Sequence, residues 1–452
     1  MTPEHYATTS AVELAALVRA GEVTATELAA AATARHRATD ATIHAVVEWY
    51  DEPSRPTGPA GPAPGGATGP LAGVPFLRKD YGSTEAGRLV ERGSRLAAGI
   101  RATATSPYFE RLARAGIQVM GRSAVPEFIQ HGTTESRAFG PTRNPLDPTL
   151  SAGGSSGGAA AAVAAGVVPA AHASDCAGSI RIPAAACGLI GLKPTRRRVP
   201  WPDGGWGGIA EELVVTRTVA DTRLFLDVLG DDTAAGPYLG VPDRLRVGID
   251  TSHWAGALPD PRVVEWTEAA ALALEAAGHA VVVVPTPIDD ERLMTTWHPL
   301  FSRWVAAEAG ALAAATGRPL DATTLEPVTL AVLEAVAALT VDDVTTAQVE
   351  QGRITHDLAR ALADVDVLLT PTLGRAAIPL DHVGGDVVPI DRYLERNSAL
   401  FPYSFLFNVT GWPALAVPVP SAAAPLPGSV QLSGPPGSEH RLLALATVLT
   451  GR

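Results

Sequence analysis

Two segments rich in glycine and serine stand in the middle of the chain: Ser151-Ala-Gly-Gly-Ser-Ser-Gly-Gly158 and Asp175-Cys-Ala-Gly-Ser-Ile-Arg181. The first runs directly into Ala159-Ala-Ala-Ala-Val-Ala-Ala-Gly166, an alanine-rich run that favours a helix and that a flexible linker would not adjoin. A turn that opens a helix leaves several backbone N–H groups without partners. Serine hydroxyls and backbone donors can therefore converge at one place, and the pattern indicates a hydrolytic site.

The composition is that of a folded, acidic protein. Of the 452 residues, 46% are hydrophobic and 18% are charged, which is typical of globular rather than disordered chains. The formal net charge of −12 disfavours nucleic acid and anionic membranes as partners, because neither attracts an acidic surface. The sequence shows neither a long apolar run nor the pattern of a secretory signal, so we expect no membrane span and a cytoplasmic protein. Cys176 and Cys187 are too few for a disulfide framework, and no cysteine or histidine cluster predicts a metal site.

The secondary-structure pattern indicates an α/β fold. Ser10-Ala-Val-Glu13 and Thr24-Ala-Thr-Glu27 have the capping-box spacing that opens a helix. Helical segments then alternate with strand-like runs, which are residues 117–120, 244–249, 278–284 and 365–370. Strands that alternate with helices predict a sheet that is covered on both faces.

Three further regions have a distinct character. Residues 51–70 combine many prolines with glycines, which remove backbone donors and stiffness, so we expect a surface loop. Residues 286–360 have helical patterns with few strand signals, and we expect a mainly helical cap over one edge of the sheet. Trp201-Pro-Asp-Gly-Gly-Trp-Gly-Gly208 leaves two interpretations open: a surface loop with one buried indole, or a gate over the pocket.

Three side chains are candidates for the chemistry: Lys79, Ser155 and Ser179. A serine hydroxyl is a weak nucleophile near neutral pH and needs a base. Lys79 follows the apolar run Val74-Pro-Phe-Leu77, which would carry it inward on a strand, and burial lowers a lysine pKa so that the amine can accept a proton. The turn that begins at Cys176 can supply backbone N–H groups for an oxyanion.

These residues lie within longer motifs. Gly153-Gly-Ser-Ser-Gly-Gly158, Asp175-x-x-Gly-Ser-Ile-Arg181-x-Pro-Ala-Ala185 and Cys187-Gly-Leu-Ile-Gly-Leu-Lys-Pro-Thr195 have the order and spacing of an amidase signature. The chain thus resembles the amidase signature family of hydrolases. Matches outside the signature extend the resemblance over most of the chain: Gly69-Pro-Leu-Ala-Gly-Val-Pro75, Lys79-Asp80, Arg143-Asn-Pro145, Thr218-Val-Ala-Asp221, Leu369-Thr-Pro-Thr372, Phe407-Asn-Val-Thr-Gly-Trp-Pro-Ala414 and Gly434-Pro-Pro-Gly437. The resemblance implies a central mixed, twisted β-sheet in a single domain, 1–452, with its core signature region at about 70–225.

The resemblance also implies a Ser–cis-Ser–Lys triad. Ser179 would be the nucleophile, and Ser155, preceded by a cis peptide bond, would relay its proton to neutral Lys79. The oxyanion hole would consist of the backbone N–H groups of Cys176, Ala177, Gly178 and Ser179. Supporting hydrogen bonds are expected from Ser156, Asp175 and Arg181. Water would release an acyl- or carbamoyl-enzyme from Ser179, and no metal or organic cofactor is needed.

The expected substrate pocket follows from position in relatives and from the tryptophan-bearing loop. Its predicted lining is Phe128, Ile129, Gly132 and Trp206. Many relatives have Gly-Gly before the nucleophile where this chain has Ala177-Gly178, so the oxyanion turn is an expected point of difference. Ile182 stands where the A-type subunits of glutamyl-tRNA amidotransferases have glutamine, which disfavours a role on tRNA.

We therefore predict an amidohydrolase that cleaves C–N bonds of small apolar or aryl amides through an acyl-enzyme on Ser179. Carbamates (urethanes) and esters are further candidate substrates, because all three classes pass through the same oxyanion. The expected partner is a small molecule, and the chain is expected to be a monomer or homodimer. Two alternatives stay open: a partner-dependent protein like the A-type subunits of amidotransferases, or an α/β-hydrolase-type esterase. The esterase alternative takes Gly153-Gly-Ser-Ser-Gly157 as a G-x-S-x-G elbow and needs an acid and a histidine such as His382 or His440.

Overall fold

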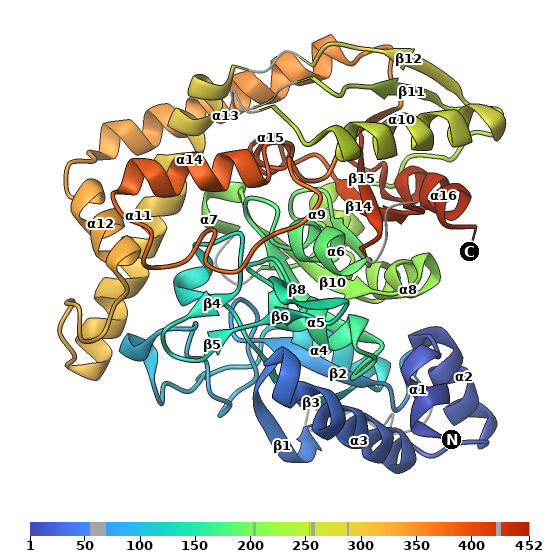
Figure 1. Ribbon diagram of the computed structural model, residues 1–452, viewed down its shortest axis with the longest axis vertical. Helices are drawn as coiled ribbons and strands as arrows, with labels where there is room; N and C mark the ends of the chain where they lie inside the picture. The colour runs from blue at the N-terminus through green and yellow to red at the C-terminus, as the bar shows by residue number, and fades with distance from the viewer. Residues whose placement is uncertain are drawn as a thin grey trace.

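A β-sheet of 11 strands forms the centre of the molecule (Figure 1). The computed structural model describes residues 1–54, 69–201, 205–252, 254, 258–286, 289–421 and 426–451. The strands lie in the order β1-β3-β2-β8-β10-β9-β14-β15-β13-β11-β12. Their bounds are β1 Val46–Ser54, β2 Pro75–Lys79, β3 Gln118–Ser123, β8 Ala170–Asp175, β9 Ile190–Lys193, β10 Glu211–Thr216, β11 Arg246–Ile249, β12 Ala280–Val283, β13 Val367–Pro371, β14 Ala414–Val419 and β15 Gly428–Ser433. The short strands β4 Glu135–Ser136, β5 Gly140–Pro141, β6 Arg143–Asn144 and β7 Asp147–Ser151 form two separate pairs.

The sheet is mixed and is covered on both faces. β2 is parallel to β3 and β8, whereas β10 is antiparallel to β8 and β9. β13 is parallel to β11 and antiparallel to β15. Every residue of β2, β8, β10 and β13 is buried, and because successive side chains point to opposite faces, both faces must be covered. The predicted central mixed sheet with flanking helices is confirmed.

The helices follow their local sequence signals. Both predicted capping boxes are present, at the starts of α2 and α3. The helix bounds are α1 Pro3–Thr8, α2 Ala11–Ala20, α3 Ala25–Ile43, α4 Pro107–Ala115, α5 Gly157–Ala164, α6 Arg181–Cys187, α7 Gly205–Gly208, α8 Val219–Leu229, α9 Asp232–Ala235, α10 Pro261–Ala276, α11 Asp290–Thr316, α12 Pro327–Val336, α13 Val341–Ala361, α14 Ile390–Leu400, α15 Phe405–Thr410 and α16 Glu439–Thr450, with 3₁₀ turns η1 Arg95–Ala97 and η2 Glu127–Ile129. None of the helices in the described ranges has the length and apolar character that a membrane crossing requires.

The expectation of a surface loop over residues 51–70 is wrong at its start. Residues 51–54 complete β1, which pairs antiparallel with β3 up to Ser54 opposite Val119. Pro53 is tolerated because β1 is an edge strand of the sheet, where one side of the backbone has no neighbour that needs a donor. Residues 55–68 lie outside the described residues.

Three helices, α11, α12 and α13, occupy most of the region from 290 to 361, and Figure 1 shows them along one side of the molecule with α14 beside them. Their apolar side chains form a second buried cluster, separate from the cluster that packs around the N-terminal helices and the sheet. Cys176, Ala177 and Ile182 from the glycine-rich turn belong to this second cluster. The helical region therefore packs directly over that turn.

Candidate active site

Lys79 is the last residue of β2, and its side chain is fully buried. Its Nζ lies 2.9 Å from Ser155 Oγ, 2.8 Å from Ser156 Oγ and 2.8 Å from Ser174 Oγ. Burial lowers the pKa of Lys79 to about 7, because loss of solvent disfavours the ammonium form. A lysine with this pKa is partly neutral near pH 7 and can accept a proton from a neighbouring hydroxyl.

Just before Ser155, at Gly154, the backbone passes close to the backbone of Thr133. The Gly154–Ser155 peptide bond is cis, as predicted. A Cβ on Gly154 would lie 2.4 Å from the carbonyl oxygen of Thr133, so only glycine fits there. This approach leaves the Ser155 hydroxyl beside Lys79. Among the described residues, no hydrogen bond joins the Ser179 hydroxyl to Ser155 or to any other group.

The turn between β8 and α6 is organised by Asp175. The carboxylate accepts hydrogen bonds from the N–H groups of Gly178 (2.7 Å) and Ile180 (3.2 Å). Arg181 donates to both carboxylate oxygens, at 2.9 and 2.8 Å. Burial alone would raise the pKa of Asp175, but the charge and hydrogen bonds of Arg181 outweigh it and hold this pKa at about 2. The turn is therefore built around a buried ion pair.

The donors that remain for an oxyanion are fewer than the sequence suggested. The Gly178 N–H is committed to Asp175. Within the described part of the chain, the N–H groups of Ala177 and Ser179 have no hydrogen-bond acceptor. These two donors belong to the turn that carries the Ser179 hydroxyl, and such donors can stabilise the charge that develops on an attacked carbonyl.

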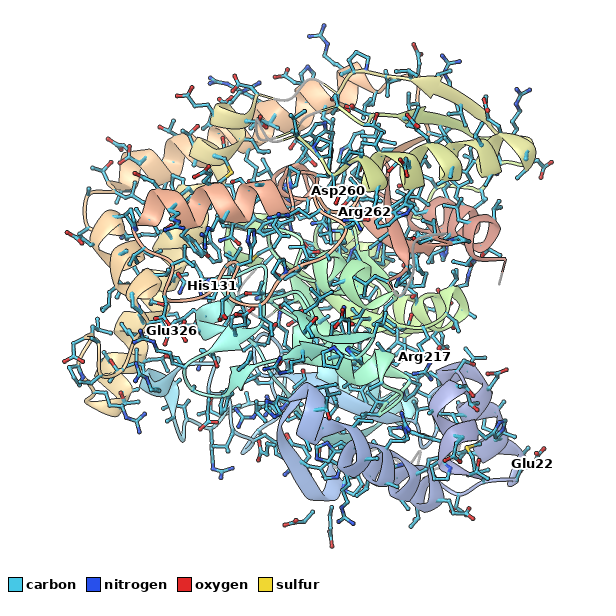
Figure 2. All side chains as sticks on the ribbon, in the orientation of Figure 1. Glu22, His131, Arg217, Asp260, Arg262 and Glu326 are labelled. Carbon is cyan, nitrogen blue, oxygen red and sulfur yellow. The ribbon has the colours of Figure 1, made fainter. Side chains whose placement is uncertain are left out.

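Replacing Arg181 by methionine should lower the free energy of unfolding by about 3–5 kcal/mol, because Asp175 would keep a buried charge without its partner. Urea unfolding followed by tryptophan fluorescence measures the change. Arg262→Met is the matched control. Arg262 pairs with Asp260 at 2.7 Å (Figure 2), and half of its side chain is exposed, so its loss should change stability by about 1 kcal/mol or less. Equal effects of the two substitutions would contradict a structural role for the buried pair.

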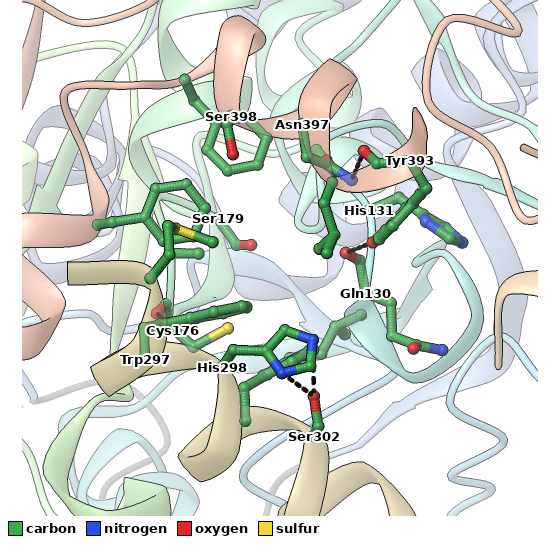
Figure 3. A pocket seen from close by; sticks show the side chains of 18 of the residues that line it. Gln130, His131, Cys176, Ser179, Trp297, His298, Ser302, Tyr393, Asn397 and Ser398 are labelled. Atoms are coloured by element: carbon green, nitrogen blue, oxygen red, sulfur yellow. Dashed lines mark hydrogen bonds between the residues drawn. The ribbon is translucent and has the colours of Figure 1, made fainter. Parts of the chain in front are cut away.

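A cavity opens beside the turn, and Figure 3 shows the Ser179 hydroxyl directed into it. Most of its wall is apolar or aromatic and comes from α6, η2, α11, α12, α14 and α15. The residues on this wall are Ile129, Ile182, Met294, Trp297, Phe301, Val332, Leu394, Phe401 and Phe405. Polar groups from Gln130, His131, His298, Ser302, Tyr393, Asn397 and Ser398 interrupt it.

The structure separates the four predicted pocket residues into two groups. Ile129 and Gly132 line the cavity, as expected. Phe128 does not, because the two residues of η2 with positive φ, 48° at Phe128 and 53° at Ile129, direct consecutive side chains to different sides. Trp206 is also absent from the lining: it stacks on Trp304 with ring centroids 3.8 Å apart, behind the cavity wall. Residues 202–204 of the predicted gate lie outside the described residues.

The contribution of α11 to the cavity was not predicted from the sequence. Met294, Trp297, His298 and Phe301 all line the cavity, and their spacing of i, i+3, i+4 and i+7 places them on one helical face. That spacing was available in the sequence as a signal. Ser174, which also contacts Lys79, was missed because it precedes the signature turn on β8.

The elbow alternative finds no support in the site. His382 contacts Arg375, and His440 packs against Tyr238 with the rings tilted and their centroids 4.3 Å apart. In the described residues, neither histidine bonds to Ser155, whose partner is Lys79. A histidine-based triad at Ser155 is therefore wrong.

Residues 27–443 match the family model described as Amidase. The chain belongs to the amidase family. It is 32% identical to the 6-aminohexanoate-cyclic-dimer hydrolase of Paenarthrobacter ureafaciens, with 97% of this chain and 93% of the relative covered. The solved structure of a 6-aminohexanoate cyclic dimer hydrolase complexed with substrate superposes on this amidase with a TM-score of 0.86 and 28% identity, covering 98% of this chain and 96% of the other.

A bacterial aryl acylamidase described as an amidase signature enzyme has the same fold, with a TM-score of 0.80. Its identity to this chain is 24%, over 98% of this amidase and 99% of the other chain. The comparisons thus agree with the family resemblance of the glycine- and serine-rich motifs. They make the chain an amidase-family hydrolase that acts on C–N bonds of amides.

Proposed function

We propose that this chain hydrolyses small apolar or aryl amides through an acyl-enzyme on Ser179. The observation that carries the proposal is the buried Lys79, whose amine lies 2.9 Å from Ser155 Oγ while Ser179 opens into an aromatic cavity. The proposed roles follow from this arrangement. Ser179 attacks the amide carbonyl, and its proton passes through Ser155 to the neutral amine of Lys79.

The remaining steps use groups of the same turn. The carbonyl oxygen becomes an oxyanion that accepts hydrogen bonds from the Ala177 and Ser179 N–H groups. Protonated Lys79 returns the proton through Ser155 to the departing nitrogen, the C–N bond breaks, and an ester to Ser179 remains. A water molecule then repeats the sequence and releases the acid. Esters and aryl carbamates form the same oxyanion, so we propose them as further substrates.

The cavity supports the choice of substrate class. Aromatic rings line it from several sides, and they belong to Trp297, Phe301, Tyr393, Phe401 and Phe405. An apolar or aryl group buries its surface there, whereas an ionised group would lose its hydration without a counter-charge. The relatives named for a cyclic amide dimer support uncharged amides as well.

In the absence of any other protein, the purified chain should hydrolyse a benzoyl or short acyl p-nitroanilide, which is measured by release of p-nitroaniline. The matched control is the succinyl p-nitroanilide, which should react at least about tenfold more slowly because its carboxylate must enter an apolar cavity. The corresponding p-nitrophenyl ester and aryl carbamate, tested at saturation, rank the three bond classes. Equal rates for neutral and charged acyl groups would contradict the proposed substrate class. Activity that arises only with a partner protein would favour the amidotransferase alternative.

A further inference from the structure

Three successive carbonyl groups of the turn before Ser179 each accept a hydrogen bond. The indole N–H of Trp297, on α11, donates to the Cys176 carbonyl oxygen at 2.8 Å. The Ser404 hydroxyl donates to the Ala177 carbonyl oxygen, and the Ile182 N–H donates to the Gly178 carbonyl oxygen at 2.7 Å. Three successive peptide planes therefore have fixed orientations.

These bonds determine where the two free donors point. The C=O and N–H of one peptide group lie in a common plane and point in opposite directions. The Cys176 carbonyl and the Ala177 N–H belong to the same peptide group. Trp297 thus fixes the direction of the Ala177 N–H by holding the opposite end of that group.

Ser404 holds the next peptide group and is closely fitted to the turn. A Cβ on Gly178 would lie 2.6 Å from Ser404 Oγ, and Gly178 has a φ of 123°, so the backbone and the hydroxyl leave no room for a side chain. The Gly178 N–H of this peptide group is bound to Asp175. Ser404 therefore prevents rotation of the group that lies between the two free donors.

Trp297 itself has little freedom. Only 6% of its surface is exposed, and its ring stacks on Phe301 and meets Phe405 edge-on, with centroids 4.6 and 5.0 Å away. Its helix is further fixed to the residues after Lys79, because Glu308 of α11 accepts a hydrogen bond from Tyr81 at 3.0 Å. The donor is thus part of a rigid helix face and not of a loop.

We propose that Trp297 and Ser404 are positioning residues that aim the Ala177 N–H at the oxyanion of the substrate. This inference rests on the proposed function of Ser179. Trp297 also lines the cavity, whereas Ser404 is not part of its lining, so the two residues separate an effect on the turn from an effect on substrate contact. The helical region beyond residue 289 consequently contributes to the rate of the reaction, in addition to forming a wall.

The test compares Trp297→Phe and Ser404→Ala with two matched controls. Trp304→Phe makes the same substitution on the same helix. Trp304 stacks on Trp206, whereas Trp297 donates to the turn. Ser429 is on β15, and its buried hydroxyl oxygen lies 3.0 Å from Thr372 Oγ1. Ser429→Ala removes this hydroxyl. For both positioning variants we expect kcat on the p-nitroanilide to fall by about 10- to 100-fold, because a misdirected donor loses most of its value in the transition state. The controls should stay within about twofold of the unaltered chain.

A second readout reports the oxyanion directly. A trifluoromethyl ketone accepts the Ser179 oxygen at its carbonyl carbon, the carbonyl π pair moves onto oxygen, and the serine proton passes toward Lys79. Its inhibition constant should rise in both variants by about the same factor as kcat/KM falls, because both depend on the same donor. For Ser404→Ala, KM should stay within about threefold, since no cavity contact is removed.

Different results would contradict the positioning role and the proposed function. An unaltered chain that hydrolyses none of the substrates would contradict the proposed function. An active unaltered chain whose variants keep kcat and ketone affinity would contradict the positioning role. If Trp297→Phe raised only KM and Ser404→Ala had no effect, Trp297 would act only as part of the cavity wall, and the positioning role would be contradicted. Circular dichroism checks folding, and if one variant does not fold, the other decides the outcome.

Discussion

Replacing Ser179 by alanine should abolish hydrolysis of the p-nitroanilide, with a fall in kcat of about 10⁵-fold or more. The alanine leaves the turn and cavity in place, because the Ser179 hydroxyl has no hydrogen bond among the described residues and its removal breaks no structural contact. What is lost is the oxygen that forms the acyl-enzyme. The remaining rate would come from binding and from the backbone donors alone.

Intact-mass measurement tests for the covalent intermediate itself. Intact-mass measurement after a slow carbamate substrate should show a covalent adduct on the unaltered chain and none on the Ser179→Ala variant. Ser429→Ala serves as the control for a buried serine elsewhere in the sheet. If Ser179→Ala retained the adduct while Ser155→Ala lost it, Ser155 would be the nucleophile and the proposed roles of the two serines would be reversed.

Replacing Lys79 by methionine should lower kcat by about 10³- to 10⁴-fold, at the upper end of what a general base contributes. Methionine fills a similar volume in a site that is fully buried, but it cannot accept a proton from Ser155. Lys79→Arg should be as inactive, because a guanidinium stays protonated at all accessible pH values. Initial rates at saturating substrate measure both losses.

The pH profile provides the second half of this prediction. Because the pKa of Lys79 is lowered to about 7, its amine is protonated below this pH and free above it. The value of kcat/KM should therefore rise with pH through an inflection near 7 and level off above it. Lys193 is the matched control, because burial also lowers its pKa, to about 8. Its amine, however, donates to the Pro194 carbonyl at 2.8 Å. An inflection that disappears in Lys193→Met would contradict the assignment to Lys79.

Local signals predicted local structure well. The capping boxes at Ser10 and Thr24 open helices, and the apolar run before Lys79 is a buried strand. In these places a few neighbouring residues contain the whole physical reason for the structure. The motif around Ser179 likewise identified residues that line the cavity, and the motif around Ser155 contains the predicted cis peptide bond.

The walls of the cavity could not be derived in the same way. Trp206 was predicted from its glycine-rich loop, yet it is Trp297, 121 residues from Cys176, that makes the contact with the turn. Helical periodicity reveals that α11 has an apolar face but not which surface that face meets. The hydrogen bond from the Gly178 N–H to Asp175 could have been predicted from the sequence, since an aspartate three residues earlier commonly accepts such a donor.

The order of strands in the sheet determines when this protein can become an enzyme during its synthesis. Among the described strands, β9 and β13 are joined through β14 and β15, which follow the other strands of this sheet in the sequence. Ser404, Asn408 and Gln431, which bind the turn or the side chain of Arg181, emerge in the same interval. A nascent chain thus holds both serines and Lys79 long before the two parts of its sheet can meet. We therefore expect hydrolytic competence only once β14 and β15 have joined the two parts of the sheet.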